Sequence, residues 1–141
     1  MNNWNRRDFV KASAALGAAS LVPSALASGY RTKLDDTIRV GVIGCGGRGT
    51  GAAFNALAAH PKVNIVAMAD LFEDRLKSSY GYMADNEDIG DRVRVDPAHK
   101  FVGFDAYKQL LALKDIDYVI LATPPHFRPI HFDAAVSAGK H

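Results

Sequence analysis

The chain has 141 residues, a formal net charge of +2, one cysteine and 48% hydrophobic residues. The first 27 residues carry three basic side chains against one acidic one, which accounts for the whole of the +2, so residues 28–141 are close to neutral. A neutral body gives no electrostatic reason to expect nucleic-acid or membrane-surface binding. A single cysteine excludes an internal disulfide, and the 114 residues after position 27 are enough for one hydrophobic core.

Residues 1–27 have the organisation of an export signal. Residues 1–11 are polar and basic, residues 12–22 are apolar but too short to span a bilayer, and residues 23–27 end in an A-x-A cleavage pattern. The adjacent Arg6 and Arg7 resemble the twin-arginine export signal. The alternatives are an ordinary secretory signal and a helix that stays attached.

This signal predicts the partner and the location of the protein. The twin-arginine translocase would carry it to the periplasm, or otherwise out of the cytoplasm. Asn5 and Val10 depart from the usual twin-arginine pattern, which has Ser or Thr and Leu at these places. No cysteine lies near the cleavage site, so we expect no lipid anchor and no stable membrane anchor.

The glycine-rich segment after the first apolar run is the strongest functional signal. Residues 38–43 predict a buried strand, which runs into a G-x-G-x-x-G turn at Gly44, Gly46 and Gly49, and a helix is predicted over 49–60. The first glycine allows a sharp turn, the second lets a pyrophosphate approach the backbone, and the third lets the helix pack close to the strand. The helix N-terminus attracts phosphate. The segment predicts a dinucleotide site.

Three other residues of this turn have open interpretations. Gly47 is included among the predicted cofactor-binding residues, although a fourth glycine also fits a plain flexible turn. Arg48 either contacts a phosphate or is a solvated loop charge. Cys45 lies between two glycines and is expected to be a small packing residue rather than a nucleophile.

Asp70 ends the second predicted strand, residues 63–69, and lies 26 residues after Gly44. That spacing is close to the one expected for an acid that binds the adenosine ribose. A carboxylate there accepts hydrogen bonds from both ribose hydroxyls and repels a 2′-phosphate, so NAD is favoured and NADP remains possible. The alternative role for Asp70 is that of a helix cap.

Strands and helices alternate along the rest of the chain, which predicts an α/β fold with a parallel sheet and right-handed crossovers. Ligands bind such sheets beyond the carboxyl ends of the strands, where the glycine turn, Asp70 and the segment 123–126 all fall. The remaining predicted elements are a leader (28–37), a helix (72–84), a polar loop (85–100), a short edge strand (101–104), a helix capped by Asp105 (105–113), a strand (117–122) and a helix (130–138).

The motifs together resemble the Gfo/Idh/MocA oxidoreductases over residues 38–141. They are V-G-V-I-G-C-G-G-R-G, V-A-M-A-D, D-Y-V-I-L-A-T-P-P-H-F and A-A-V-S-A-G-K-H, in that order. The resemblance implies a Rossmann-type doubly wound parallel sheet. It also implies that Thr123, Pro124, Pro125 and His126 line the nicotinamide side of the cofactor. The two prolines could instead only start a helix, and His126 and His131 could be helix-start or surface residues.

The resemblance also implies what the whole protein does. Family members continue past a G-K-H segment into an E-K-P motif and a second α/β domain that binds substrate and forms oligomers. We therefore expect a longer protein whose nucleotide domain is incomplete here. The leading function is an exported NAD(P)-dependent oxidoreductase acting on a sugar or polyol. The alternatives are an NAD-dependent glycosidase without net redox change and, for these 141 residues alone, a nucleotide-binding fragment without activity.

Overall fold

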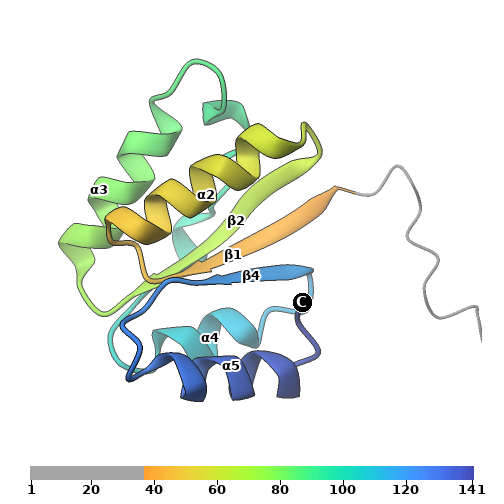
Figure 1. Ribbon diagram of the computed structural model, residues 1–141. Helices are drawn as coiled ribbons and strands as arrows, with labels where there is room; N and C mark the ends of the chain where they lie inside the picture. The colour runs from red at the N-terminus through yellow and green to blue at the C-terminus, as the bar shows by residue number, and fades with distance from the viewer. Residues whose placement is uncertain (1–36) are drawn as a thin grey trace, which may run out of the picture. The chain divides into compact units, whose positions relative to one another are not determined.

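The computed structural model describes residues 37–141, so the predicted signal (1–27) and all of the predicted leader except Thr37 lie outside the described residues. Four parallel strands form one sheet in the order β3-β2-β1-β4 (Figure 1). The elements are β1 (Ile38–Ile43), α2 (Gly47–Ala59), β2 (Val63–Asp70), α3 (Glu73–Ala84), η3 (Gly90–Arg92), η4 (Pro97–His99), β3 (Lys100–Val102), α4 (Ala106–Leu111), β4 (Tyr118–Leu121) and α5 (Arg128–Ser137). The predicted parallel α/β sheet is confirmed.

Helices cover both faces of this sheet. Figure 1 shows α2 and α3 on one face and α4 and α5 on the other. Two separate clusters of buried side chains correspond to these faces, one including Leu57 and Met83 and the other including Leu110 and Ala135. The strands therefore need apolar residues on both sides, which is why they read as continuous apolar runs in the sequence. Among the described residues, no helix is both long and apolar enough to cross a membrane.

The two faces of the sheet differ in side-chain size. Val40 and Val42 of β1 point toward α2 and α3, whereas Gly41 lies beneath α4, where an added Cβ would be 2.7 Å from Leu110 Cδ2. The register of β1 and β2 shifts after Val40, which leaves Val66 as the extra residue of a bulge in β2. Small residues on one face thus let α4 pack close to the strands.

The predicted boundaries of the helices and strands differ from the observed ones by at most two residues. Helix α2 begins at Gly47, two residues before its predicted start, because the glycine turn already adopts helical geometry there. Asp105 does occupy the N-cap position of α4, but the predicted side-chain cap is wrong: no cap hydrogen bond forms, and the carboxylate instead pairs with Lys108 at 2.8 Å. An acid one turn before a lysine has this competing partner.

The strand β4 lies at one edge of the described sheet. Its outer side is already engaged by the end of the chain, because the Val119 amide donates to the His141 carbonyl at 2.7 Å and the His141 amide donates to the Asp117 carbonyl at 3.2 Å. The start of β4 is tied to β1 by Arg39, whose Nε lies 3.1 Å from Asp117 Oδ2. These contacts fix the strand that carries the loop at residues 123–127.

Candidate functional site

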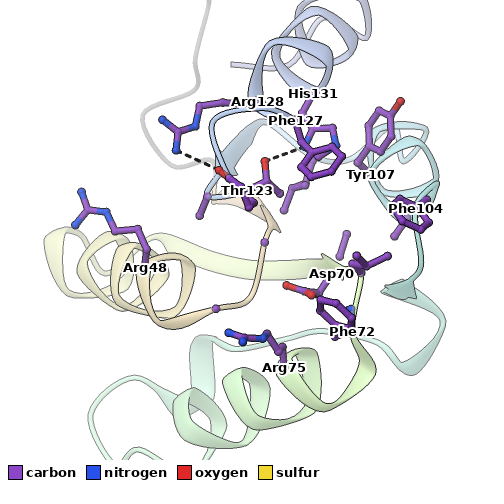
Figure 2. Close-up of a pocket in the computed structure, with 18 of the residues that line it drawn as sticks. Arg48, Asp70, Phe72, Arg75, Phe104, Tyr107, Thr123, Phe127, Arg128 and His131 are labelled. Atoms are coloured by element: carbon purple, nitrogen blue, oxygen red, sulfur yellow. Dashed lines mark hydrogen bonds between the residues drawn. The ribbon is translucent and has the colours of Figure 1, made fainter.

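A cleft of about 640 Å³ lies at the carboxyl edge of the sheet (Figure 2). It is built from the turn after β1, the end of β2, the segment after β3 and the loop after β4, so the edge predicted from the sequence is the edge that is hollowed. Most of the predicted site residues line it, namely Gly44, Gly46, Gly47, Arg48, Asp70, Thr123 and Pro124. Its volume is within the roughly 300–1,000 Å³ typical of small-molecule sites.

The glycines of the turn have different geometric constraints. Gly44 has a φ of +96°, and an added Cβ would lie 2.8 Å from the carbonyl carbon of Ala122. An added Cβ at Gly49 would lie 1.7 Å from the carbonyl oxygen of Gly44, so this position packs α2 against the turn. In contrast, Gly46 and Gly47 face open space, apart from Arg75 Nη1 at 3.5 Å from the Gly46 Cβ position. Only these two leave room for a ligand.

The N-terminus of α2 is left without an internal cap. Gly46 is the N-cap residue and makes no side-chain cap hydrogen bond, and the first turn of the helix contains no acidic residue. The amides of a first helical turn have no intrahelical acceptor. Here they meet the cleft together with the partial positive charge of the helix end, which favours an anionic group.

Asp70 connects the turn to the end of β2. Its Oδ2 accepts a hydrogen bond from the Cys45 amide at 2.5 Å and its Oδ1 accepts one from the Phe72 amide at 2.9 Å. The second bond forms an Asx turn just before α3, whose N-cap residue is Phe72 and which has no side-chain cap, so the helix-cap alternative for Asp70 is wrong. A carboxylate has about four acceptor positions, so two remain for a ligand in the cleft.

The Cys45 thiol, which lies next to Asp70, is held in its unreactive protonated form. Cys45 is buried, and its Sγ donates to the Ala69 carbonyl at 3.6 Å. Burial, assisted by the charge of Asp70, raises the pKa of the Cys45 thiol to about 12, although the bond to Ala69 opposes the shift. The thiolate is the reactive form of cysteine, so Cys45 acts as a small packing residue, as the sequence predicted.

The cleft does not use every predicted residue. Gly49, Pro125 and His126 are absent from its lining. Gly49 is buried behind the turn, and His126 is exposed with its ring 5.3 Å from that of Phe127 in an edge-on arrangement. Arg48 lines the mouth, and Figure 2 shows its guanidinium group directed away from Asp70. Residues 125–127 form a turn between β4 and α5, which begins at Arg128.

Sequence reasoning missed several lining residues near the end of β2. Phe72 and Phe104 both line the cleft with more than half of their surface exposed, and Arg75 reaches toward the glycine turn from α3 (Figure 2). Within the described chain, the structure gives the Arg75 side chain no hydrogen bond or ion pair. The sequence did contain a signal for these lining residues, because residues that follow β2 and β3 lie at the same carboxyl edge of the sheet.

A buried histidine closes the opposite wall. His131 is 9% exposed, and its Nδ1 lies 3.0 Å from the Thr123 hydroxyl. Its ring lies 4.3 Å from that of Tyr107 and 6.4 Å from that of Phe127, between centroids. Burial lowers the pKa of His131, which favours the neutral imidazole. The alternative of a surface histidine, weighed from the sequence, is therefore wrong for His131.

The donor set of the cleft fits a dinucleotide. Uncapped helix amides and an open glycine face suit a pyrophosphate, a carboxylate with free acceptor positions suits ribose hydroxyls, and exposed aromatic rings suit a base. The described residues contain no group of three or more His, Cys, Asp or Glu side chains that could hold a metal ion.

Sequence comparisons agree with this geometry. Residues 38–141 match the Gfo/Idh/MocA family, described as an oxidoreductase family with an NAD-binding Rossmann fold, and residues 5–23 match a twin-arginine translocation signal. Two curated relatives are both named glycosyl hydrolase family 109 protein. The one from Streptomyces niveus is 35% identical over 74% of this chain, and the one from Solibacter usitatus is 30% identical over 100% of it. The matches span only 20% and 32% of the relatives' own lengths.

Solved structures share the fold. Scyllo-inositol dehydrogenase from Lactobacillus casei, with bound NAD(H) and scyllo-inositol, matches 75% of this chain and 27% of its own at 22% identity and a TM-score of 0.56. A 3-ketoreductase from Actinomadura kijaniata in complex with NADP matches 75% of this chain and 29% of its own at 30% identity and a TM-score of 0.54. The chain therefore belongs to the Gfo/Idh/MocA oxidoreductase family, and residues 38–141 are its NAD-binding Rossmann domain.

Proposed function

We propose that the cleft holds NAD and that the whole protein is an exported enzyme that uses this cofactor on a sugar or polyol. The observation that carries the proposal is the uncapped N-terminus of α2 beside the open face of Gly46, next to the Asp70 carboxylate. Bound there, NAD would supply a hydride acceptor, and its reduced form a hydride donor.

Each part of the cleft has an assigned role in this proposal. The first-turn amides of α2 bind the pyrophosphate, with the Arg75 guanidinium as a nearby cation. Asp70 accepts hydrogen bonds from the adenosine ribose through its two remaining acceptor positions. Thr123 and Pro124 contact the nicotinamide side. The exposed rings of Phe72 and Phe104 lie near Asp70 and cover the adenine.

A second candidate function is glycoside hydrolysis with NAD as a retained cofactor, in which the sugar is oxidised transiently and reduced again. The names of the curated relatives favour it, whereas the dehydrogenase and reductase structures favour net oxidation or reduction. The two differ in their products. Supplied with NAD and a nitrophenyl glycoside, a hydrolase releases nitrophenol with no accumulation of NADH, whereas a dehydrogenase given a free sugar or polyol accumulates NADH.

The cofactor assignment is tested by a single substitution in the turn. We expect the purified 141-residue chain to bind NAD and Gly46→Val to abolish the binding, because the valine side chain would occupy the space proposed for the pyrophosphate. The fold should survive, since only the end of the Arg75 side chain lies near that position. Isothermal titration with NAD measures the affinity, and circular dichroism controls for folding. Retained affinity in a folded Gly46→Val chain would contradict the proposal.

Export by the twin-arginine route is consistent with a cofactor-dependent protein, because this route carries folded proteins and NAD is made in the cytoplasm. We propose that the protein folds around NAD before export and reaches the periplasm with the cofactor bound. Lysine at both Arg6 and Arg7 should leave the chain in the cytoplasm, as measured by fractionation. NAD released from periplasmic protein by denaturation, and identified by mass, would support loading before export.

A further inference from the structure

The loop after β4 is held from behind by one face of α5. Arg128 Nη2 donates to the Thr123 carbonyl at 3.1 Å, and His131 Nδ1 lies 3.0 Å from the Thr123 hydroxyl. Residues three apart on a helix share a face, so the first turn of α5 reaches back to a single residue with two side chains. Figure 2 shows both hydrogen bonds converging on Thr123 at the wall of the cleft.

The imidazole of His131 is fixed in orientation as well as in place. Its ring lies beside that of Tyr107 from α4, and it is nearly parallel to that of Phe127 from the start of α5 at an interplanar angle of 19°. These two contacts set the plane of the ring, and the Thr123 hydroxyl sets its rotation within that plane. One hydrogen bond therefore joins the hydroxyl to the imidazole nitrogen in a defined direction, and the tautomer of the ring sets which of them donates.

Thr123 is in turn next to the glycine turn. Its backbone nitrogen would lie 2.9 Å from a Cβ added at Gly44, and both residues line the cleft. A displacement of Thr123 would therefore change the wall that faces the N-terminus of α2. Preorganised walls bind ligands more tightly than walls that must be ordered at binding.

A stabilising role alone does not explain a histidine at this place. A polar side chain buried for a single neutral hydrogen bond contributes little net stability, and an apolar residue of similar volume is often tolerated equally well. The rings of Tyr107 and Phe127 beside His131 would also accept a leucine. The property that leucine lacks is the bond to Thr123.

We propose that His131 is a positioning residue for nucleotide binding, which holds Thr123 and the loop that begins there in the form that the dinucleotide meets. The inference rests on the proposed NAD site. It assigns no chemical step to the histidine, because His131 acts through Thr123.

The test uses matched pairs of variants of the 141-residue chain. His131→Leu and Thr123→Val each remove the hydrogen bond without adding bulk, whereas His131→Asn and Thr123→Ser each keep a hydrogen-bonding group at the same distance from the backbone. We expect the first pair to raise the Kd for NAD by about three- to tenfold, the usual range for one hydrogen bond. We expect the second pair to restore most of the affinity, and the melting temperature of His131→Leu to be no lower than that of the wild type.

The double variant Thr123→Val with His131→Leu should bind NAD no more weakly than either single variant, since both remove the same bond. Unchanged affinity in the first pair, with NAD bound by the wild type, would overturn the inference and leave the proposed function standing. Affinity losses that follow the melting temperature, or that Asn and Ser do not restore, would also overturn it. A folded wild-type chain that binds no NAD overturns the proposed function and this inference together.

Discussion

Asp70 shows how one side chain can serve the fold and the cleft together. Its two oxygens accept hydrogen bonds from the amides of Cys45 and Phe72, so the carboxylate joins the glycine turn to the start of α3. These bonds also prevent the carboxylate from rotating away from the cleft. A negative charge is thus held where a ribose would lie, with the Arg75 guanidinium also in the cleft lining.

Replacing Asp70 with alanine should change both affinity and selectivity. We expect NAD to bind roughly 10- to 100-fold more weakly, because hydrogen bonds to a charged group contribute about 1.5–3 kcal/mol. The affinity for NADP should fall less than that for NAD, or should rise, because a repulsive charge disappears and Arg75 remains to attract a 2′-phosphate. Titration with both nucleotides measures the ratio, and Asp88→Ala, which removes an exposed acid outside the cleft, is the control. An unchanged preference for NAD would contradict the ribose role.

At the level of elements, the glycines in and before α2 have different structural roles, although they form one glycine-rich run in the sequence. Gly49 is buried against the turn, whereas Gly51 is exposed in the body of the helix with nothing within 4 Å of an added Cβ. Glycine in a helix interior costs about 0.5–1 kcal/mol relative to alanine. Within α2, close packing therefore requires glycine at position 49 but not at position 51.

Alanine at these two positions should have opposite effects on stability. Gly51→Ala should raise the free energy of unfolding by about 0.5–1 kcal/mol, because it removes the conformational cost of a helical glycine. Gly49→Ala should lower it by about 2 kcal/mol or more, because the new Cβ would overlap the Gly44 carbonyl and force α2 away. Urea denaturation followed by circular dichroism measures both. Equal stability of the two variants would show that α2 does not need this close approach.

For the whole molecule, the cleft exists because successive crossovers bring separate segments to one edge of the sheet. Helices α4 and α5 form the wall opposite Asp70, and His131 is buried in that wall. Burial disfavours the imidazolium and lowers the pKa of His131 in the folded chain. The protonation of this histidine is therefore linked to the stability of the folded chain.

The sign of this linkage predicts an acid-sensitive fold. The unfolded chain binds a proton at His131 near the usual pKa of about 6.5, and the folded chain binds it only at lower pH. The contribution of neutral His131 to the free energy of unfolding is therefore fully present above about pH 6.5. It is lost as the pH falls through the pKa of His131 in the folded chain. Urea denaturation between pH 8 and pH 5 should show a falling free energy of unfolding, with a smaller fall in His131→Leu. Identical pH profiles would contradict this linkage.

Much of the fold could be predicted from the sequence because it depends on local patterns. Continuous apolar runs identified β1, β2 and β4, and alternation with helices identified the parallel sheet. The side-chain cap expected at Asp105 failed because Lys108 competes for the same carboxylate. The bulge at Val66 could not be anticipated either, since it depends on how β1 pairs with β2.

Part of the site could likewise be predicted from the sequence, whereas the rest depended on the tertiary structure. The sequence by itself determined the glycine turn, Asp70 and the end of β4, because each follows a strand and strand ends define the ligand edge. Only the tertiary structure decided that Pro125 and His126 turn away from the cleft while Arg75 and His131 line it. Spacing along the chain fixes which edge a residue reaches. The packing of α3 and α5 against the sheet fixes which way its side chain points.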